Sequence, residues 1–145
     1  MKIHFTYPSA DGRTLIHAIR WIPDNQKPVG ILQIAHGMVE FIDRYDEFAR
    51  FLNRKGYVVV GNDHLGHGGS VVSHHDLGHF GEVAGYKVLI SDMHIVPVPI
   101  IRICPILCLG TAWGLSCFRP IFDNTQKVLR VPSSWGRDAT IQRCF

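Results

Sequence analysis

Hydrophobic and polar positions along the first part of the chain alternate with period two before they change to a helical period. The stretch HFTYPSADGRTLIHAIRWIP holds two β-favouring runs around turn residues Ala10, Asp11 and Gly12, which predicts an antiparallel hairpin. The short apolar run GILQIAH predicts a buried strand from about Gly30 to Ala35. A loop at HGMVEF is expected to follow it.

From Asp43 onwards the apolar side chains recur at the spacing of one helical face, and Gly56 is placed to close the helix. These side chains are Tyr45, Phe48, Phe51 and Leu52. The run YVVVGND, from Tyr57 to Asp63, predicts a second buried strand. Strand, helix and strand in this order predict a parallel crossover. A further helix is expected from about Gly81 to His94.

Length, composition and net charge limit the classes of protein to which this chain can belong. A length of 145 residues suits one domain or part of one, and 46% hydrophobic against 19% charged residues is a globular composition. The net charge of +3 comes without a run of Lys or Arg, so no nucleic-acid partner is expected. The N-terminus MKIHFTYPSADG lacks the apolar core of a secretory signal, from which we expect a cytoplasmic protein.

Composition changes abruptly near residue 95. Through His94 there are ten acidic and nine basic residues, three of the eight prolines and no cysteine. From Ile95 onwards there are two acidic and six basic residues, five prolines and all four cysteines. The two parts therefore differ in charge, proline and cysteine content, and we expect a boundary between residues 1–95 and 96–145.

Two linked motifs precede that boundary. HGMVEFIDRY leads into the predicted helix, and YVVVGNDHLGHGGS follows it. Together they resemble the front half of an α/β hydrolase, and more narrowly the monoacylglycerol lipase and lysophospholipase group, which is serine aminopeptidase S33-like. The positions that match the pattern HGxxE, RY and DHxGHGxS are His36, Gly37, Glu40, Arg44, Tyr45, Asp63, His64, Gly66, His67, Gly68 and Ser70.

The resemblance implies an α/β fold that opens with the hairpin and continues with parallel strands and crossover helices. It also implies that His36, Gly37 and Met38 form the oxyanion-hole loop, with Met38 as the N–H donor and His36 as a structural residue. Asp63 and the following GHG are expected to shape a loop, and Glu40 either braces the oxyanion loop or is a surface carboxylate. The implied substrate is a lipid ester, with no cofactor and no specific protein partner.

Five histidines gather after the second parallel strand, which raises the question of a metal site. They are His64, His67, His74, His75 and His79. Because no HExxH or other ordered ligand set is present, we expect no metal and a histidine-rich loop near the rim of the active site instead. Cys104, Cys108 and Cys117 likewise lack a second CxxC pair or a histidine partner.

The family's nucleophile motif is missing. A serine hydrolase of this kind carries GHSMG after its fifth strand, but no GxSxG occurs in this sequence. Ser70 lies in GGSVV and Ser116 in GLSCF, and neither has the final glycine of the sharp turn. The family's acid and histidine are expected late in the chain, and none is assigned here. The stretch LGTAWGLS, residues 109–116, stands where the motif belongs.

The genetic code offers an explanation for this stretch. If Cys108 to Gly114 are encoded TGC TTG GGC ACA GCA TGG GGT, codons that start one base earlier read CTT GGG CAC AGC ATG GGG, which is LGHSMG. We therefore expect that the reading frame changes between about Asp92 and Ile100, and that residues 96–145 are an out-of-frame, irregular tail. The chain would then be an inactive truncated or frameshifted product.

Two other classes of protein stay open. The first is a non-catalytic binding module of hydrolase ancestry. The second is a membrane-anchored protein, because residues 95–118 are apolar enough to suggest a membrane span, for which about 20 apolar residues suffice. Arg102 and the prolines at 97, 99 and 105 count against such a span.

Overall fold

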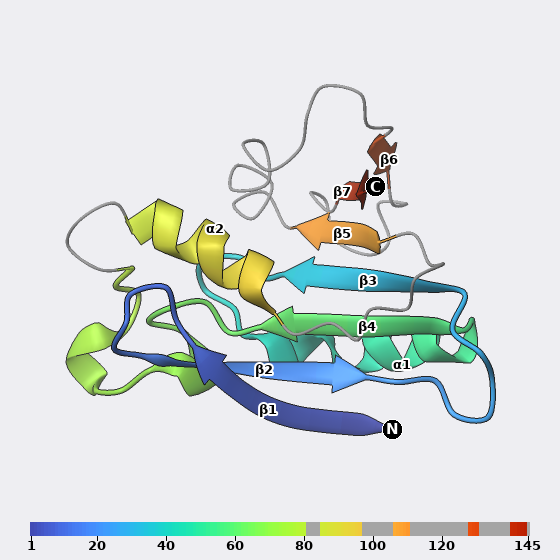
Figure 1. The fold of residues 1–145 in the computed structure, drawn as a ribbon, viewed down its shortest axis with the longest axis horizontal. Coiled ribbons are helices and arrows are strands. Elements are labelled where there is room, and N and C mark those ends of the chain that lie inside the picture. The colour runs from blue at the N-terminus through green and yellow to red at the C-terminus, as the bar shows by residue number, and fades with distance from the viewer. Residues whose placement is uncertain (81–84, 97–105, 111–127, 131–139, 145) are drawn as a thin grey trace.

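The computed structural model describes residues 1–80, 85–96, 106–110, 128–130 and 140–144. Its central feature is a seven-stranded mixed sheet with the strand order β1-β2-β4-β3-β5-β7-β6 (Figure 1). The strands are β1 Lys2–Pro8, β2 Leu15–Trp21, β3 Gly30–Ala35, β4 Tyr57–Asn62, β5 Ile106–Gly110, β6 Val128–Arg130 and β7 Thr140–Cys144. Helices α1, Asp46–Arg54, and α2, Gly85–Ile95, accompany them.

The predicted opening hairpin is confirmed. Strands β1 and β2 pair antiparallel, with Lys2 opposite Trp21 and Pro8 opposite Leu15. Asp11 shapes the connection, because its Oδ1 accepts the backbone N–H of Arg13 at 2.7 Å and that of Thr14 at 2.8 Å. The hairpin then joins the sheet through β2, which pairs antiparallel with β4.

The predicted strand, helix and strand also form, with one difference at the start of the helix. Strands β3 and β4 pair parallel, with Gly30 opposite Tyr57. The helical segment begins with a 3-10 turn, η1 at Ile42–Tyr45, and becomes α-helical only at Asp46. It ends after Arg54, where Gly56 takes a φ of +87° that suits a residue without Cβ.

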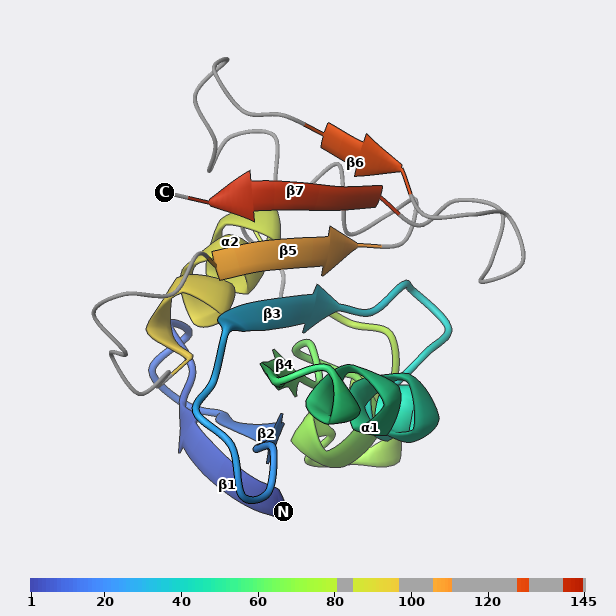
Figure 2. The ribbon, with the colours of Figure 1, turned by 90° about the vertical axis from the view of Figure 1, so that its right-hand side faces the viewer.

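Alternate side chains of the strands build two cores, one on each face of the sheet. On one face Ile19, Trp21 and Val59 pack with residues of α1. On the other face Ile16 and Val60 belong to the cluster against which α2 packs. Figure 2 shows the two helices on opposite sides of the strands. This alternation explains why β4 reads as a continuous apolar run, since both of its faces are covered.

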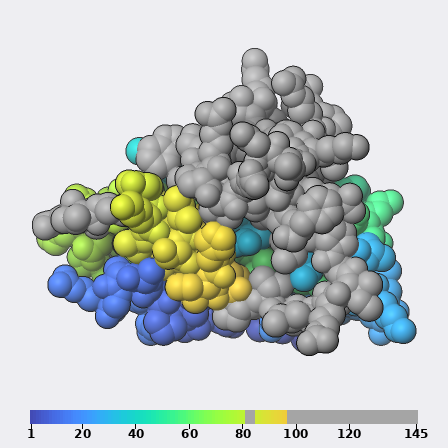
Figure 3. Space-filling view, turned by 45° about the horizontal axis from the view of Figure 1, so that its top comes forward, coloured from blue at the N-terminus to red at the C-terminus, as the bar shows by residue number. Residues whose placement is uncertain are grey.

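Helix α2 is anchored to the hairpin by a buried carboxylate. The Asp92 side chain accepts the Ser9 hydroxyl at 2.8 Å and the Ala10 backbone N–H at 2.6 Å. Tyr7 donates its hydroxyl to the Asp92 carbonyl oxygen at 2.8 Å. Figure 3 shows α2, in yellow, against the blue N-terminal hairpin. Of the helix predicted over residues 81–94, residues 81–84 lie outside the described part.

The prediction of an irregular tail needs correction at three segments. Residues 106–110, 128–130 and 140–144 form strands, and β5 pairs parallel with β3 while β7 and β6 continue antiparallel. The physical reason is that β3 without β5 would present a row of unpaired backbone groups. The rest of the tail lies outside the described residues.

Within the described residues, none of the helices has the length and apolar character needed to cross a bilayer. Most of the span considered at residues 95–118 is not described, and its described part at Ile106–Gly110 is a β-strand.

Candidate active site

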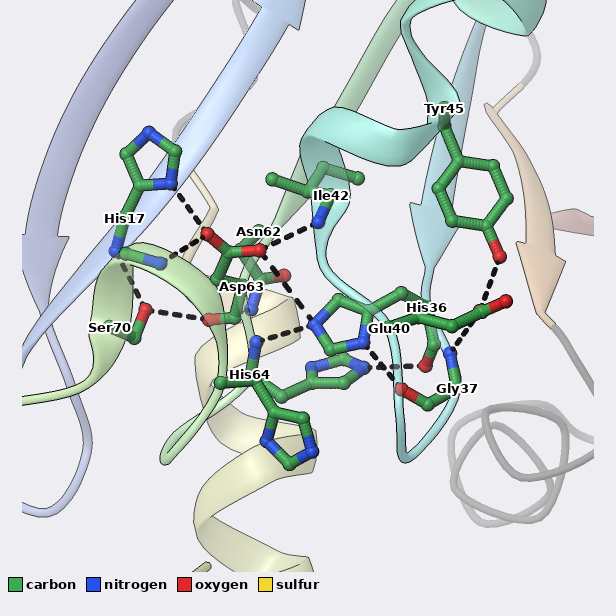
Figure 4. A network of polar contacts seen from close by, with 12 residues as sticks. His17, His36, Gly37, Glu40, Ile42, Tyr45, Asn62, Asp63, His64 and Ser70 are labelled. Atoms are coloured by element: carbon green, nitrogen blue, oxygen red, sulfur yellow. Dashed lines mark hydrogen bonds and ion pairs between the residues drawn. The ribbon is translucent and has the colours of Figure 1, made fainter. Parts of the chain in front are cut away.

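The segments that follow β3 and β4 are joined by one network of polar contacts (Figure 4). His36 is the first residue after β3, while Asp63 and His64 directly follow β4. The carboxyl ends of parallel strands are the usual place for ligands in open α/β sheets. These two segments carry all the site residues predicted from the sequence, namely His36, Gly37, Met38, Glu40, Arg44, Tyr45, Asp63, His64, Gly66, His67, Gly68 and Ser70.

His36 uses both ring nitrogens inside the fold. The His64 backbone N–H donates to His36 Nε2 at 2.9 Å, so this nitrogen carries no proton. The proton sits on Nδ1, which donates to the Gly37 carbonyl oxygen at 2.7 Å. Burial lowers the pKa of His36, although the Gly37 carbonyl and Asp63 act in the opposite direction. The neutral ring ties the end of β3 to the end of β4, and neither nitrogen is free to act as a base.

The backbone N–H groups of Gly37 and Met38 differ in their partners. Gly37 N–H donates to Oε2 of Glu40 at 2.9 Å. Met38 N–H has no acceptor among the described residues, and the Met38 side chain is half-exposed. The Met38 carbonyl oxygen lies 2.7 Å from Nε2 of His67, which fixes the peptide that follows Met38. A positioned N–H without an internal acceptor is what an oxyanion donor requires.

Glu40 makes polar contacts with the loop itself. Its carboxylate accepts the Gly37 N–H and the Tyr45 hydroxyl, the latter at 2.7 Å. Arg44 Nη1 lies 4.0 Å from Oε1 of the same carboxylate. Although burial acts to raise the pKa of Glu40, these two hydrogen bonds and Arg44 lower it below its usual value. The motif residues Glu40, Arg44 and Tyr45 therefore act as one unit that holds the loop.

Asp63 is the centre of the network on the β4 side. The carboxylate is buried, and Oδ1 accepts the Ile42 backbone N–H at 2.6 Å. Oδ2 accepts the Gly69 N–H at 2.8 Å and lies 2.7 Å from Nδ1 of His17. The Ser70 hydroxyl donates to the Asp63 carbonyl oxygen at 2.8 Å and accepts the His17 backbone N–H at 2.9 Å. These contacts tie the segment after β4 to the start of η1 and to His17 in β2.

Two glycines of the motif stand where no side chain fits. Gly66 has a φ of +73°, and a Cβ there would overlap the backbone of Asp76 and His79. Gly68 has a φ of +46°, and a Cβ there would overlap the Asp63 carboxylate. These positions need both a left-handed backbone and an absent side chain. The GHG pattern is thus a packing requirement of this loop.

His64 and His67 are buried beside His36. His64 Nε2 lies 3.1 Å from the His36 carbonyl oxygen and must donate to it. Burial, and then the neighbouring His36, lower the pKa of His64 well below its usual value. The buried Nδ1 of His64 has no partner among the described residues. The His36 and His64 ring centroids are 4.0 Å apart, so the two rings pack as part of the loop core.

The remaining histidines of the cluster do not join these three. His74, His75 and His79 are exposed, and His75 and His79 line a cleft of about 500 Å³ together with Gly66 and Ser70. In the described parts of the chain, no three or more His, Cys, Asp or Glu side chains are grouped to hold a metal ion. The five histidines that are close in the sequence therefore lie in two environments, one buried and one exposed.

His17 belongs to the network and was not predicted to do so. It lies in β2, about 45 residues before Asp63, and only the pairing of β2 with β4 brings the two together. A signal exists in the sequence, because His17 shares its sheet face with Ile19 and Trp21, which are both buried. A polar residue on an otherwise apolar face marks a specific partner.

Strand β5 ends beside the loop that follows β3. It pairs parallel with β3, and Gly110 lies opposite Ala35, the residue before His36. The sequence beyond Gly110 thus starts at the same edge of the sheet as the loop. Residues 111–116 themselves lie outside the described part, so the turn that they would form is not described.

The strand order β1-β2-β4-β3-β5, with helices on both faces and the loop after β3 beside the end of β5, defines an α/β-hydrolase fold. Residues 26–114 match the family described as serine aminopeptidase, S33. Since the match covers more than half of the chain, the chain belongs to this family. The match continues past the compositional boundary at residue 95 and includes β5.

Similar proteins extend this finding. The chain is 30% identical to human monoglyceride lipase over 87 residues, which are 60% of this chain and 24% of that protein. The chain therefore spans about a quarter of the length of this curated relative.

Three solved structures are also similar. A lipase in its open form has a TM-score of 0.70 and 26% identity over 82% of this chain and 39% of that one. A thermostable carboxyl esterase from Bacillus coagulans has a TM-score of 0.58 and 30% identity, covering 64% of this chain and 29% of that one. A monoglyceride lipase from Saccharomyces cerevisiae shares the fold at 18% identity, with a TM-score of 0.62 over 77% of this chain and 35% of that one.

Proposed function

We propose that the complete enzyme to which this sequence corresponds hydrolyses a carboxylic ester of a lipid, a monoacylglycerol or a lysophospholipid, through a serine nucleophile. The serine oxygen attacks the ester carbonyl, the alcohol leaves with a proton, and water then releases the fatty acid from the acyl-enzyme. The observation that carries this proposal is the Met38 N–H, which has no acceptor among the described residues and lies in a braced loop beside the end of β5. The likeness to human monoglyceride lipase supports the lipid ester.

We assign His36, Gly37 and Met38 to the oxyanion-hole loop of that enzyme, with Met38 N–H as the donor. The first N–H of the loop is consumed by Glu40, which leaves the second for a tetrahedral oxyanion. His36, Asp63, His64 and His67 act as positioning residues, since their polar contacts run to backbone groups of the two loops and, for Asp63, also to the His17 and Ser70 side chains.

We also propose that the chain as it stands has no esterase activity. Ala112 occupies the position that serine takes when LGTAWG is aligned with LGHSMG. A donor without a nucleophile, an acid or a base supplies only a small part of the catalysis. The chain thus contributes half of an oxyanion hole and no triad.

The proposed cause is a change of reading frame between about Asp92 and Ile100, with residues 96–145 translated out of frame. The shift in cysteine, proline and charge content near residue 95 supports it. The family match through Gly114 fits the same proposal, because Leu109, Gly110 and Gly114 are identical in both readings of the stretch. A shifted frame that keeps these residues retains part of the family pattern while it loses the serine.

The experiment compares three purified proteins with a short-chain nitrophenyl ester and a fluorophosphonate probe. They are the chain itself, its Ala112→Ser variant and a protein expressed from the frame-restored gene. We expect turnover and probe labelling only in the last, since Ala112→Ser supplies neither an acid nor a base. Serine-dependent turnover by the chain itself, blocked by the probe, contradicts the proposed inactivity. An inactive but folded frame-restored protein contradicts the proposed enzyme function.

Nucleotide sequence tests the frame directly. The proposal requires that the frame one base earlier stays open beyond codon 100 and spells GHSMG at codons 110–114. A stop codon or an unrelated reading in that frame overturns it, whatever the assays show.

A further inference from the structure

A second histidine pair lies at the outer side of the network, where His17 on β2 meets His4 on β1. Thr6 is directly opposite His17 in the register, so His4 and His17 are diagonal neighbours on one face of the sheet. Nδ1 of His4 is 3.0 Å from Nε2 of His17, and the two ring centroids are 5.3 Å apart. His4 is exposed and the His17 side chain is 20% exposed, so solvent reaches the pair.

The partners of His17 fix which of its nitrogens has a lone pair. Nδ1 of His17 faces Oδ2 of Asp63 at 2.7 Å, and the carboxylate accepts, so Nδ1 carries the proton. In the neutral ring Nε2 is then an acceptor. The hydrogen bond to Nε2 must come from Nδ1–H of His4. The arrangement orients the His17 lone pair outward, towards His4 and solvent.

We propose that His4 Nδ1 and His17 Nε2 are two ligands of a divalent transition-metal site, with Zn²⁺ as the reference ion and water in the remaining positions. A histidine that donates its other N–H to a carboxylate is the usual arrangement of a metal ligand, because the carboxylate fixes the ring and raises its basicity. Asp63 takes this outer position. On binding, the Nδ1 proton of His4 is exchanged through solvent for one on Nε2 of the same ring, so Nδ1 offers its lone pair to the ion and both imidazoles stay neutral.

The spacing of the two nitrogens suits such an ion. Zn–N bonds of about 2.0–2.1 Å at a tetrahedral angle place two ligand nitrogens about 3.3 Å apart. The observed 3.0 Å therefore has to open by only a few tenths of an ångström. The exposed His4 ring is the partner that moves, since His17 is held by Asp63.

Local charge does not oppose a cation at this place. Lys2 shares the sheet face of His4, but its ammonium group pairs with Asp43 and Asp46 and lies 5.8 Å from the centre of the Trp21 ring. The carboxylate behind His17 is buried and adds negative charge on the inner side of the site. With two protein ligands, the site would be open and exchangeable.

The test is a Zn²⁺ titration of the full chain, followed by calorimetry and by the histidine ring signals in NMR spectra. We expect one equivalent to bind with shifts at His4 and His17. His4→Asn is the main variant because His4 is exposed and its loss leaves the Asp63 network intact. We expect binding to weaken by at least about tenfold, since even a lost outer partner costs 10–100-fold. His17→Asn gives the same result if the variant folds.

His75→Asn is the matched control, because His75 is an exposed histidine in the other histidine-containing segment. It should bind Zn²⁺ like the unmodified chain. Binding that depends on His75 and survives His4→Asn overturns the proposal. Absence of binding, or binding that none of the three substitutions weakens, overturns it as well. The cysteine content is the same in all variants, so thiol binding cannot imitate the expected difference.

Discussion

The segment after β3 and the segment after β5 begin at the same edge of the sheet, yet only the first contains the residues of its family motif. In the first, both ring nitrogens of His36 are hydrogen-bonded, and the Gly37 N–H donates to Glu40. The second has no serine in its motif. The difference teaches that the described hydrogen bonds of the loop after β3 run within that loop and to the segment after β4, and that none of them involves the missing serine. Substitutions in the network should therefore change stability, and their effects can be ranked.

Asp63→Asn should cause the largest loss. An amide in place of the carboxylate puts an NH₂ group against backbone N–H donors that are buried with it. We expect about 3 kcal/mol less free energy of unfolding, as for other broken buried polar networks. Urea denaturation followed by circular dichroism measures it. Asp24→Asn, at an exposed carboxylate that pairs with the N-terminus, should cost less than about 1 kcal/mol. Equal losses in the two variants would show that the network is not a special source of stability.

Gly68→Ala should rank next, with Gly78→Ala as its control. Both residues have positive φ, but a Cβ at Gly68 overlaps Asp63 whereas a Cβ at Gly78 meets nothing within 4 Å. We expect about 1 kcal/mol for the backbone strain at Gly78 and at least about 2 kcal/mol at Gly68, where the overlap adds to it. The same denaturation experiment separates the two. If both variants lose the same free energy of unfolding, the close approach to Asp63 is not the reason why position 68 requires glycine.

Acidification should weaken the network through its buried histidines. The pKa values of His36 and His64 are lowered in the folded chain, so the unfolded chain binds more protons once the pH falls below about 6.5. Stability therefore rises with pH in this window and falls on acidification, by up to about 1.4 kcal/mol per pH unit for each ring. Urea midpoints between pH 7 and about 5.5 measure the slope. His64→Gln should reduce the slope of stability against pH, and the substitution His94→Gln at an exposed position should not. The reverse result would show that the buried histidines are not the cause of the pH dependence.

Glu40→Gln should have the smallest effect of the four. It weakens the bonds from Gly37 N–H and the Tyr45 hydroxyl, and we expect a loss of about 1 kcal/mol at pH 7. Because the folded pKa of Glu40 is lowered, its stabilisation is present above the unfolded value of 4.5 and is lost as the pH falls through the folded value. The gap between the two proteins should thus narrow in acid. Exposed Glu47→Gln should leave the denaturation curve unchanged at both pH values.

The sequence predicted the hairpin and the parallel pair with its helix correctly, because each depends on local patterns of apolar residues and turns. It missed His17, since the partner of that side chain is set by the antiparallel pairing of β2 with β4. It also left Glu40 undecided between loop brace and surface carboxylate. In the structure, the fold of the loop brings Gly37 N–H and the Tyr45 hydroxyl onto this one carboxylate.

By itself, the sequence determined the kind of fold and the missing nucleophile motif. Periodicity and motif spacing are local properties, and the lack of GxSxG can be read directly from the residues. The tertiary structure decided which groups meet: the protonated nitrogen of His36, the Met38 N–H without a described acceptor, and the pairing of β5 with β3 beside the loop. It also separated five histidines that are neighbours in the chain into buried braces and exposed residues. The physical reason is that contacts between distant residues follow from strand pairing and burial, which no local pattern specifies.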